Sequence, residues 1–225
     1  PARGVGRRDM RAVPVDDIMA AVIKKVGVIG AGQMGNGIAH VAALAGFDVV
    51  LNDVSPDRLK SGMATINGNL ARQVSKKAVS EDDKAKAMAR ITPAEKLDDL
   101  ADCDLVIETA VEKEEVKRKI FHDVCAALKP DAIVASNTSS ISITRLAAST
   151  DRPERFIGIH FMNPVPVMKL VELVRGIATD ESTFSAAREY VTSLEKTITV
   201  SEDFPAFIVN RILLPMINEA IYTLY

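Results

Sequence analysis

Short apolar runs alternate along this chain with longer stretches in which apolar residues recur every three or four positions. The short runs predict strands at 26–29, 47–51, 91–93, 104–109, 132–135, 156–161, 169–174 and 197–200. The longer stretches predict helices at 34–45, 56–77, 81–90, 113–128, 143–148, 182–194 and 206–225. Strands and helices that alternate in this way are typical of an α/β fold with a doubly wound, mostly parallel sheet.

Two connections depart from that simple alternation. The helices 56–77 and 81–90 follow one another, which predicts a helical hairpin inserted after the second strand. The strands 156–161 and 169–174 are joined by so short a link that they can pair as an antiparallel hairpin.

The pattern also predicts how the chain divides. We assign residues 24–204 to one domain and residues 205–225 to the first helix of a helical C-terminal domain, since no glycine or polar cap ends that helix. Residues 1–18 show no clear period, and we expect a disordered N-terminal extension over residues 1–23. Met19 would be a natural start.

A glycine loop follows the first predicted strand directly. Gly30, Gly32 and Gly35 have the spacing G-x-G-x-x-G at the start of the helix 34–45. In such loops the first glycine allows a tight turn, the second lets the backbone approach a pyrophosphate, and the third lets the helix pack on the strand. Glycine loops also serve as plain structural turns, but the flanking strand and helix favour a Rossmann-like dinucleotide site, with phosphate at the helix N-terminus.

Asp53 is a second sign of the same site. It follows the strand 47–51 and lies 18 residues after Gly35, close to the usual spacing of about 20. A carboxylate at this position accepts hydrogen bonds from ribose hydroxyls and repels a 2′-phosphate. We therefore predict NAD rather than NADP as the cofactor.

The composition argues against several kinds of binding partner. The 225 residues include 28 Lys and Arg against 30 Asp and Glu, and this net charge of -2 argues against a nucleic-acid partner. No apolar run approaches the roughly 20 residues of a membrane helix, so we expect no membrane partner. Cys103 and Cys125 are far apart and lack metal-site spacing, which favours reduced thiols in a cytoplasmic protein and no bound metal.

The histidines are candidates for proton transfer, because oxidation of an alcohol with NAD releases a proton. His40 and His122 lie in predicted helices, where we expect structural or solvated side chains. His160 lies near the end of the strand 156–161, and Glu172 lies within the next strand. A buried acid needs a partner, and a His–Glu pair would fix the imidazole tautomer and favour the imidazolium. The alternatives are a core histidine and a solvent-facing glutamate.

Further polar residues follow predicted strands at the edge where doubly wound sheets bind ligands. They are Asp53, Thr109 to Glu112 and Asn137 to Ser139. Ser139 either caps the next helix or hydrogen-bonds a substrate oxygen. Asn210, on the last helix, is either a surface or helix-contact amide or a ligand of the substrate oxygen.

Taken together, these features resemble the L-3-hydroxyacyl-CoA dehydrogenases, particularly the short-chain 3-hydroxybutyryl-CoA dehydrogenases. The resemblance extends from about Lys24 to Tyr225 and is carried by VGVIGAGQMGNGIA, ETAVE, SNTSS, GIHFMNPVPVMKLVEL and FIVNR. The fourth motif is the most specific, because its His, Asn-Pro-Val-Pro and Lys-Leu-Val-Glu occur together. Here FMNP replaces the FFNP common in the family, an apolar change that leaves the chemistry intact.

The resemblance implies an NAD-dependent enzyme that interconverts (S)-3-hydroxybutyryl-CoA and acetoacetyl-CoA. It implies that His160 is the general base paired with Glu172, and that Ser139 and Asn210 contact the substrate near the reacting carbon. The implied cofactor-binding residues are Gly30, Gly32, Gln33, Met34 and Gly35 at the pyrophosphate, Asp53 at the adenosine ribose, and Glu112, Lys117, Asn137 and Ser139 nearby. It further implies that the helical hairpin helps to hold an acyl-CoA thioester, and that a homodimer forms through the C-terminal helical domain.

Two other functions remain open. One is a related dehydrogenase that acts on a free hydroxy acid or sugar acid, which competition by CoA would distinguish. The other is a non-catalytic NAD-binding protein, because a fold alone does not fix function.

Overall fold

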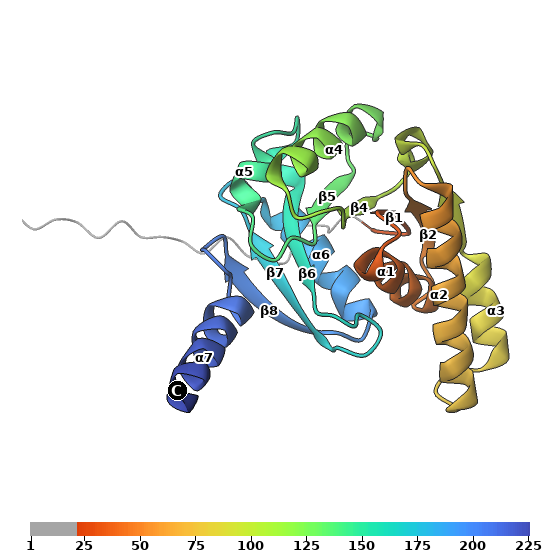
Figure 1. Cartoon of the computed structure of the whole chain (residues 1–225). Coiled ribbons are helices and arrows are strands. Elements are labelled where there is room, and N and C mark those ends of the chain that lie inside the picture. The colour runs from red at the N-terminus through yellow and green to blue at the C-terminus, as the bar shows by residue number, and fades with distance from the viewer. Residues whose placement is uncertain (1–21) are drawn as a thin grey trace, which may run out of the picture.

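The computed structural model describes residues 22–225, and residues 1–21 of the predicted N-terminal extension lie outside that range. The described residues form a sheet of eight strands in the order β3-β2-β1-β4-β5-β6-β7-β8, with helices on both sides (Figure 1). The strands are β1 (Lys25–Ile29), β2 (Asp48–Asn52), β3 (Ile91–Ala94), β4 (Leu105–Glu108), β5 (Ile133–Ser136), β6 (Phe156–Phe161), β7 (Leu170–Arg175) and β8 (Thr197–Glu202). The helices are α1 (Gln33–Leu44), α2 (Pro56–Ser75), α3 (Glu81–Ala89), α4 (Glu114–Ala127), α5 (Ile143–Ala147), α6 (Glu181–Ser193) and α7 (Val209–Leu224). The predicted α/β fold is confirmed.

Strand direction places the functional edge of the sheet. Strands β1 to β6 are paired in parallel, so their carboxyl ends meet along one edge. Strand β1 lies between β2 and β4, which is the point where the strand order reverses and where such sheets bind ligands. Strands β6 and β7 are antiparallel, which their short link allows, and their register sets His160 directly opposite Glu172.

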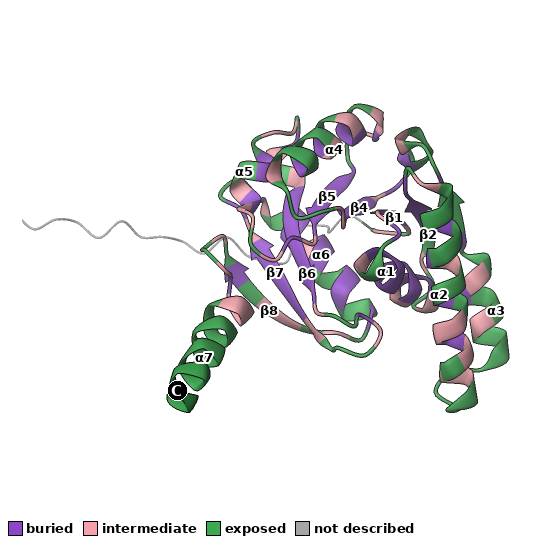
Figure 2. Ribbon diagram, in the orientation of Figure 1, coloured by how far each residue is buried: buried purple, intermediate pink, exposed green. Residues whose placement is uncertain are grey.

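Helices cover both faces of the sheet. On one face α1, α2, α3 and α6 build a cluster that includes Ile38, Ile66 and Tyr190. On the other face α4 and α5 contribute Phe121 and Leu146 to a second cluster. The central strands are consequently buried while the outer surfaces of the helices are exposed (Figure 2). Burial on both faces explains why these strands are continuous apolar runs rather than alternating ones.

The two helices after β2 form the predicted hairpin. Leu59, Ile66 and Leu70 are buried along one side of α2, which packs against α1 and α3. Ser55 and Ser80 cap α2 and α3, each accepting a hydrogen bond from a backbone N–H three residues later. The polar side of α2 is thereby left facing the glycine loop.

The predicted start of the last helix, at residue 206, is wrong. Helix α7 begins at Val209, and Ala206 and Phe207 have φ of 68° and 50°, in the left-handed region. This turn buries the Phe207 side chain, which is 5% exposed, and aims the next N–H groups at the Glu172 carboxylate. Those contacts outweigh the cost of the left-handed backbone.

Helix α7 extends away from the sheet and has no buried residue (Figures 1 and 2). Its exposed apolar side chains are Ile212, Leu213, Leu214, Met216, Ile217, Ile221, Tyr222 and Leu224. Among the described residues, no helix is both long enough and apolar enough to cross a membrane.

Candidate active site

The glycine loop between β1 and α1 has the geometry that its spacing predicts. Gly30 has φ of 101°, a conformation that favours glycine. A Cβ at Gly35 would lie 1.7 Å from the Gly30 carbonyl oxygen, so only glycine lets α1 pack this close to β1. A Cβ at Gly32 would meet nothing within 4 Å. The loop therefore leaves open space at its second glycine, where a phosphate would approach.

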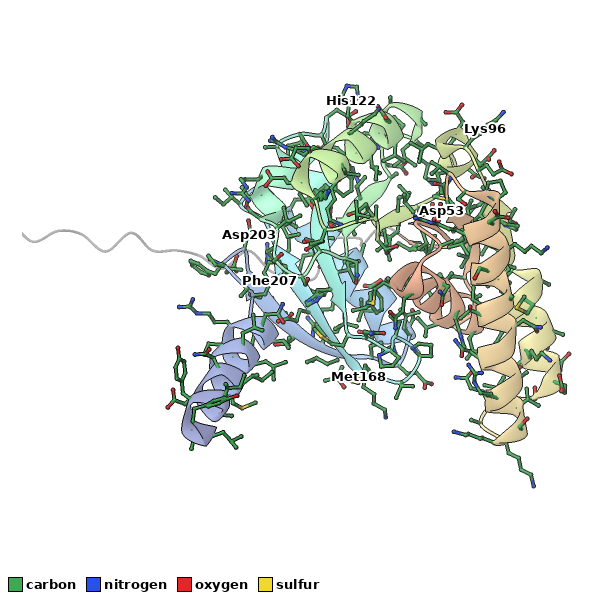
Figure 3. The ribbon with its side chains drawn as sticks, in the orientation of Figure 1. Asp53, Lys96, His122, Met168, Asp203 and Phe207 are labelled. Atoms are coloured by element: carbon green, nitrogen blue, oxygen red, sulfur yellow. The ribbon has the colours of Figure 1, made fainter. Side chains whose placement is uncertain are left out.

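The N-terminus of α1 and the carboxylate of Asp53 flank that space. Gly32 is the N-cap residue, and no side chain caps the first turn, so the helix dipole and the N–H groups of Gln33 and Met34 face the site. Asp53 is buried at the end of β2 (Figure 3) and accepts a hydrogen bond from the Ala31 N–H at 2.9 Å. The residues fit a dinucleotide, since donors for phosphate and an acceptor for ribose lie on adjacent strand ends.

A buried ion pair lies beneath the carboxyl ends of β4 and β5. The Lys117 side chain is 1% exposed, and its Nζ lies 2.7 Å from Glu108 Oε1 and 3.3 Å from Glu112 Oε2. The second Glu108 oxygen accepts a hydrogen bond from Ser136 Oγ at 2.8 Å. The Lys117 ammonium is thus held inside the protein, where it positions Glu112. Direct contact of Lys117 with the cofactor stays a prediction.

Glu112 in turn holds the Ser-Asn-Thr-Ser-Ser loop that follows β5. Its Oε1 accepts hydrogen bonds from Thr138 Oγ1 at 2.5 Å and from the Ser139 N–H at 3.1 Å. Burial opposes ionisation of Glu112, but these hydrogen bonds and the Lys117 charge outweigh it and lower the pKa of the carboxyl. Asn137 Oδ1 accepts a hydrogen bond from the last N–H of β6 at 2.9 Å. The loop is therefore fixed to both neighbouring strands.

His160 and Glu172 form the predicted pair. The His160 Nδ1 lies 2.6 Å from Glu172 Oε2, with both residues buried. Because an ionised carboxylate only accepts, Nδ1 carries the proton, and Nε2 is left as the basic nitrogen. Burial opposes the charge on Glu172, but hydrogen bonds from His160 and from two backbone N–H groups outweigh it and lower the pKa of this carboxyl. A stable negative charge beside the imidazole is what proton transfer to Nε2 requires.

Residues 207–210, in the turn before α7 and at the start of that helix, complete the surroundings of this pair. The N–H groups of Ile208 and Val209 donate to Glu172 Oε1 at 3.0 and 2.9 Å. The Phe207 ring packs edge-on against the imidazole, with 6.0 Å between ring centroids. Asn210 Nδ2 donates to the Ser139 carbonyl oxygen at 3.1 Å. The turn before α7 and the first residues of that helix therefore contact the base, its carboxylate partner and the loop after β5.

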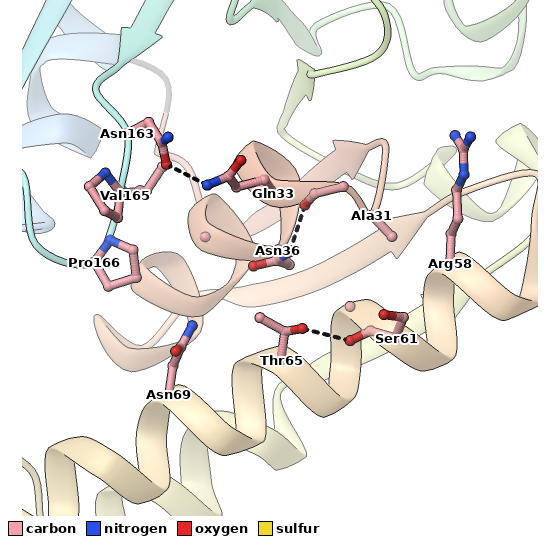
Figure 4. Close-up of a pocket in the computed structure, with 14 residues that line it drawn as sticks. Ala31, Gln33, Asn36, Arg58, Ser61, Thr65, Asn69, Asn163, Val165 and Pro166 are labelled. Atoms are coloured by element: carbon pink, nitrogen blue, oxygen red, sulfur yellow. Dashed lines mark hydrogen bonds between the residues drawn. The ribbon is translucent and has the colours of Figure 1, made fainter.

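A cavity of about 470 Å³ opens beside the glycine loop (Figure 4). One wall is the polar side of α2, and the other is the loop between β6 and β7. Its lining residues are Ala31, Gly32, Gln33, Asn36, Gly37, Arg58, Ser61, Gly62, Thr65, Asn69, Asn163, Pro164, Val165 and Pro166. His160 does not line this cavity but lies at the end of β6, just before the loop that forms its wall. Both thus lie at the carboxyl edge of the sheet.

The structure gathers every residue predicted for the site along that one edge, but it also adds residues that sequence reasoning missed. Glu108 could have been found, because the argument that an acid in an apolar strand needs a partner applies to it as it does to Glu172. Phe207 could not have been identified from the sequence, since it is one apolar residue in an apolar stretch. Among residues 22–225, no group of three or more His, Cys, Asp or Glu side chains could hold a metal ion.

Comparison with known proteins identifies relatives across most of the chain. The family profile described as 3-hydroxyacyl-CoA dehydrogenase, NAD binding domain, matches residues 25–204. The 3-hydroxybutyryl-CoA dehydrogenase of Bradyrhizobium diazoefficiens is 85% identical over 207 residues, which are 92% of this chain and 71% of that protein. The probable 3-hydroxybutyryl-CoA dehydrogenase of Bacillus subtilis is 46% identical over 203 residues, covering 90% of this chain and 71% of the relative.

Solved structures agree with these matches. The crystal structure of (S)-3-hydroxybutyryl-CoA dehydrogenase from Ralstonia eutropha superposes with a TM-score of 0.86 at 48% identity, covering 88% of this chain and 70% of that one. On the profile match over residues 25–204 and on its identity to these relatives, the chain belongs to the 3-hydroxyacyl-CoA dehydrogenase family.

Proposed function

We propose that this protein is an NAD-dependent dehydrogenase that interconverts (S)-3-hydroxybutyryl-CoA and acetoacetyl-CoA. The observation that carries the proposal is the His160–Glu172 pair at the carboxyl edge of a dinucleotide-binding sheet. Membership of the family and relatives described as 3-hydroxybutyryl-CoA dehydrogenases support the choice of substrate.

The chain's own residues account for the proton transfer. Bound NAD⁺ supplies the acceptor for the hydride that leaves C3 of the substrate. His160 Nε2 accepts the proton of the C3 hydroxyl, while Nδ1–H donates to Glu172 and holds the ring in place. Glu172 then stabilises the imidazolium. Ser139 and Asn210, which the structure joins by a hydrogen bond, orient the reacting oxygen.

The cofactor is held by the glycine loop and its neighbours. The space at Gly32 and the uncapped N-terminus of α1 receive the pyrophosphate, while Asp53 binds the adenosine ribose. Glu112 follows β4, and Asn137 and Ser139 follow the adjacent strand β5. This order along one edge of the sheet supports the assignment of these residues to the cofactor.

The cavity between α2 and the β6–β7 loop is the proposed site of the CoA portion. Arg58, Thr65 and Asn69 offer polar groups along α2, while Val165 and Pro166 offer an apolar wall opposite (Figure 4). A nucleotide with an apolar arm requires that mixture of contacts. The position of the cavity next to β6 supports a route for the acyl arm toward His160.

We further propose that the protein acts as a cytoplasmic homodimer. Cys103 and Cys125 are buried free thiols, and burial raises the pKa of Cys103 to about 12 and that of Cys125 to about 11. Cysteines that stay unpaired are typical of a reducing compartment, and the raised pKa keeps both thiols protonated and unreactive. The exposed apolar side of α7 supports association through the C-terminal helical region, which light scattering on the full-length protein would test.

The deciding experiment follows NADH absorbance at about 340 nm with the full-length protein. We expect absorbance to fall with acetoacetyl-CoA and to remain constant with free acetoacetate. Oxidation of NADH by the free acid alone would instead support a hydroxy-acid dehydrogenase. NADH binding without turnover of either substrate would support a non-catalytic protein.

A further inference from the structure

The loop between β6 and β7 is held from behind by a lysine on a different part of the chain. Lys196 lies in the link between α6 and β8. Its Nζ donates to the Val165 carbonyl at 2.6 Å and to the Met168 carbonyl at 2.8 Å. One ammonium group therefore joins the two ends of the turn that forms a wall of the cavity.

These two bonds supplement a turn with little internal support. Within the loop, the N–H groups of Val167 and Met168 both donate to the Pro164 carbonyl, at 3.0 and 2.9 Å. Lys196 has no carboxylate within 4.0 Å among the described residues, so the carbonyl groups are its partners. Partial burial, together with the neighbouring Lys169 charge, lowers the pKa of Lys196. The Lys196 ammonium is thus bound by carbonyl groups of the loop and forms no ion pair with a described residue.

The opposite side of the loop is seated on α1. A Cβ at Gly37 would lie 2.9 Å from Val165 Cβ, so the loop rests directly on that glycine. At the β6 end of the loop, Asn163 Oδ1 accepts a hydrogen bond from Gln33 Nε2 at 3.1 Å (Figure 4). The loop is clamped between α1 and Lys196, and its distance from α2 sets the width of the cavity.

We propose that Lys196 is a positioning residue that holds the β6–β7 loop in the conformation that binds the CoA portion of the substrate. The proposal rests on the proposed function, since it assigns the cavity to CoA. Without Lys196 the loop would have to be ordered by the substrate, and that entropic cost would weaken binding. His160 would be little affected, because the β6–β7 pairing and Glu172 hold it independently of the loop.

The test compares Lys196→Met with Lys169→Met. Lys169 is the exposed last residue of the loop, and its ammonium makes neither of the two hydrogen bonds of Lys196, so its substitution removes the same charge and leaves those bonds in place. We expect Lys196→Met to raise KM for acetoacetyl-CoA about tenfold, which corresponds to about 1.4 kcal/mol, with kcat and NADH affinity nearly unchanged. Lys169→Met should leave KM within about twofold of the wild type. Lys196→Arg, whose guanidinium can reach both carbonyls, should restore part of the affinity.

Hydrogen exchange of residues 163–168 gives a measure independent of activity. We expect the N–H groups of Val167 and Met168 to exchange faster in Lys196→Met than in Lys169→Met. Unchanged exchange and KM in Lys196→Met would overturn the proposal, as would an equal rise of KM in both variants or a loss confined to kcat. If Lys196→Met does not fold, Lys196→Gln provides the same comparison, because its amide reaches one carbonyl at most. A wild-type protein that binds NADH but does not turn over acetoacetyl-CoA would refute the proposed function instead.

Discussion

Replacing Glu172 by glutamine tests the central pair with a change of one atom. Glu172 accepts hydrogen bonds on both sides: from His160 at 2.6 Å, and from the Ile208 and Val209 N–H groups at 3.0 and 2.9 Å. Glutamine has one acceptor oxygen and one NH₂ donor. If the oxygen keeps the two backbone bonds, the NH₂ faces His160 and forces Nδ1 to become the acceptor. Nε2 then carries the proton and cannot act as the base.

Typical contributions of a general base and of a charge-assisted hydrogen bond set the size of the expected effect. A positioned general base contributes about 10²–10⁴ in rate, so kcat should fall by about that factor in Glu172→Gln. The protein should also lose about 2–3 kcal/mol of unfolding free energy, because a charge-assisted hydrogen bond in a buried site is replaced by a neutral one. Cofactor binding should change little, since Glu172 does not touch the glycine loop.

The pH dependence of stability follows from the lowered pKa of Glu172. A carboxyl whose pKa is lower when folded contributes stability above its unfolded pKa, and this contribution is lost as pH falls through the folded value. The wild type should therefore lose stability between about pH 4.5 and more acid values, and Glu172→Gln should lose less over that range. Chemical denaturation at several pH values measures how the free energy of unfolding changes with pH in both proteins.

Turnover of acetoacetyl-CoA, NADH fluorescence titration and chemical denaturation are the three assays. Glu202→Gln is the matched control, because Glu202 is an exposed acid on the neighbouring strand β8. It should behave as the wild type. A Glu172→Gln protein that keeps kcat within about threefold of the wild type, with normal NADH affinity, would refute the role of the pair in catalysis.

Three further predictions concern the cofactor site and its support. Gly35→Ala should abolish folding or cofactor binding, because its Cβ would clash with the loop backbone. Gly32→Ala should fold normally and lose NADH affinity. Circular dichroism measures folding and fluorescence titration measures NADH affinity. Asp53→Ala should weaken NADH binding at least tenfold, or about 1.4 kcal/mol, in the same titration, and an unchanged affinity would exclude a ribose contact. Lys117→Met should lower the free energy of unfolding by about 3–5 kcal/mol, because it leaves the Glu108 charge buried without its ammonium partner. Adding Glu108→Gln should recover part of this loss, and chemical denaturation measures both variants.

Much of the fold could be predicted because its signals are local. The apolar runs of β4 and β5, the glycine loop and the caps at Ser55 and Ser80 depend on residues close in sequence. The start of α7 could not be predicted in this way. Its boundary depends on the burial of Phe207 and on a carboxylate more than thirty residues earlier, neither of which leaves a local pattern.

The sequence by itself determined the glycine loop, the acid at the end of β2, and the candidates for base and partner, since each rests on residue type and spacing. Only the tertiary structure decided what these residues contact. Antiparallel pairing of β6 with β7 brings His160 against Glu172, and docking of α7 turns Glu172 into the acceptor of two further N–H groups. Burial likewise makes Lys117 a support for Glu112. Such contacts join residues distant in the chain, and their geometry is fixed by packing, which spacing alone does not encode.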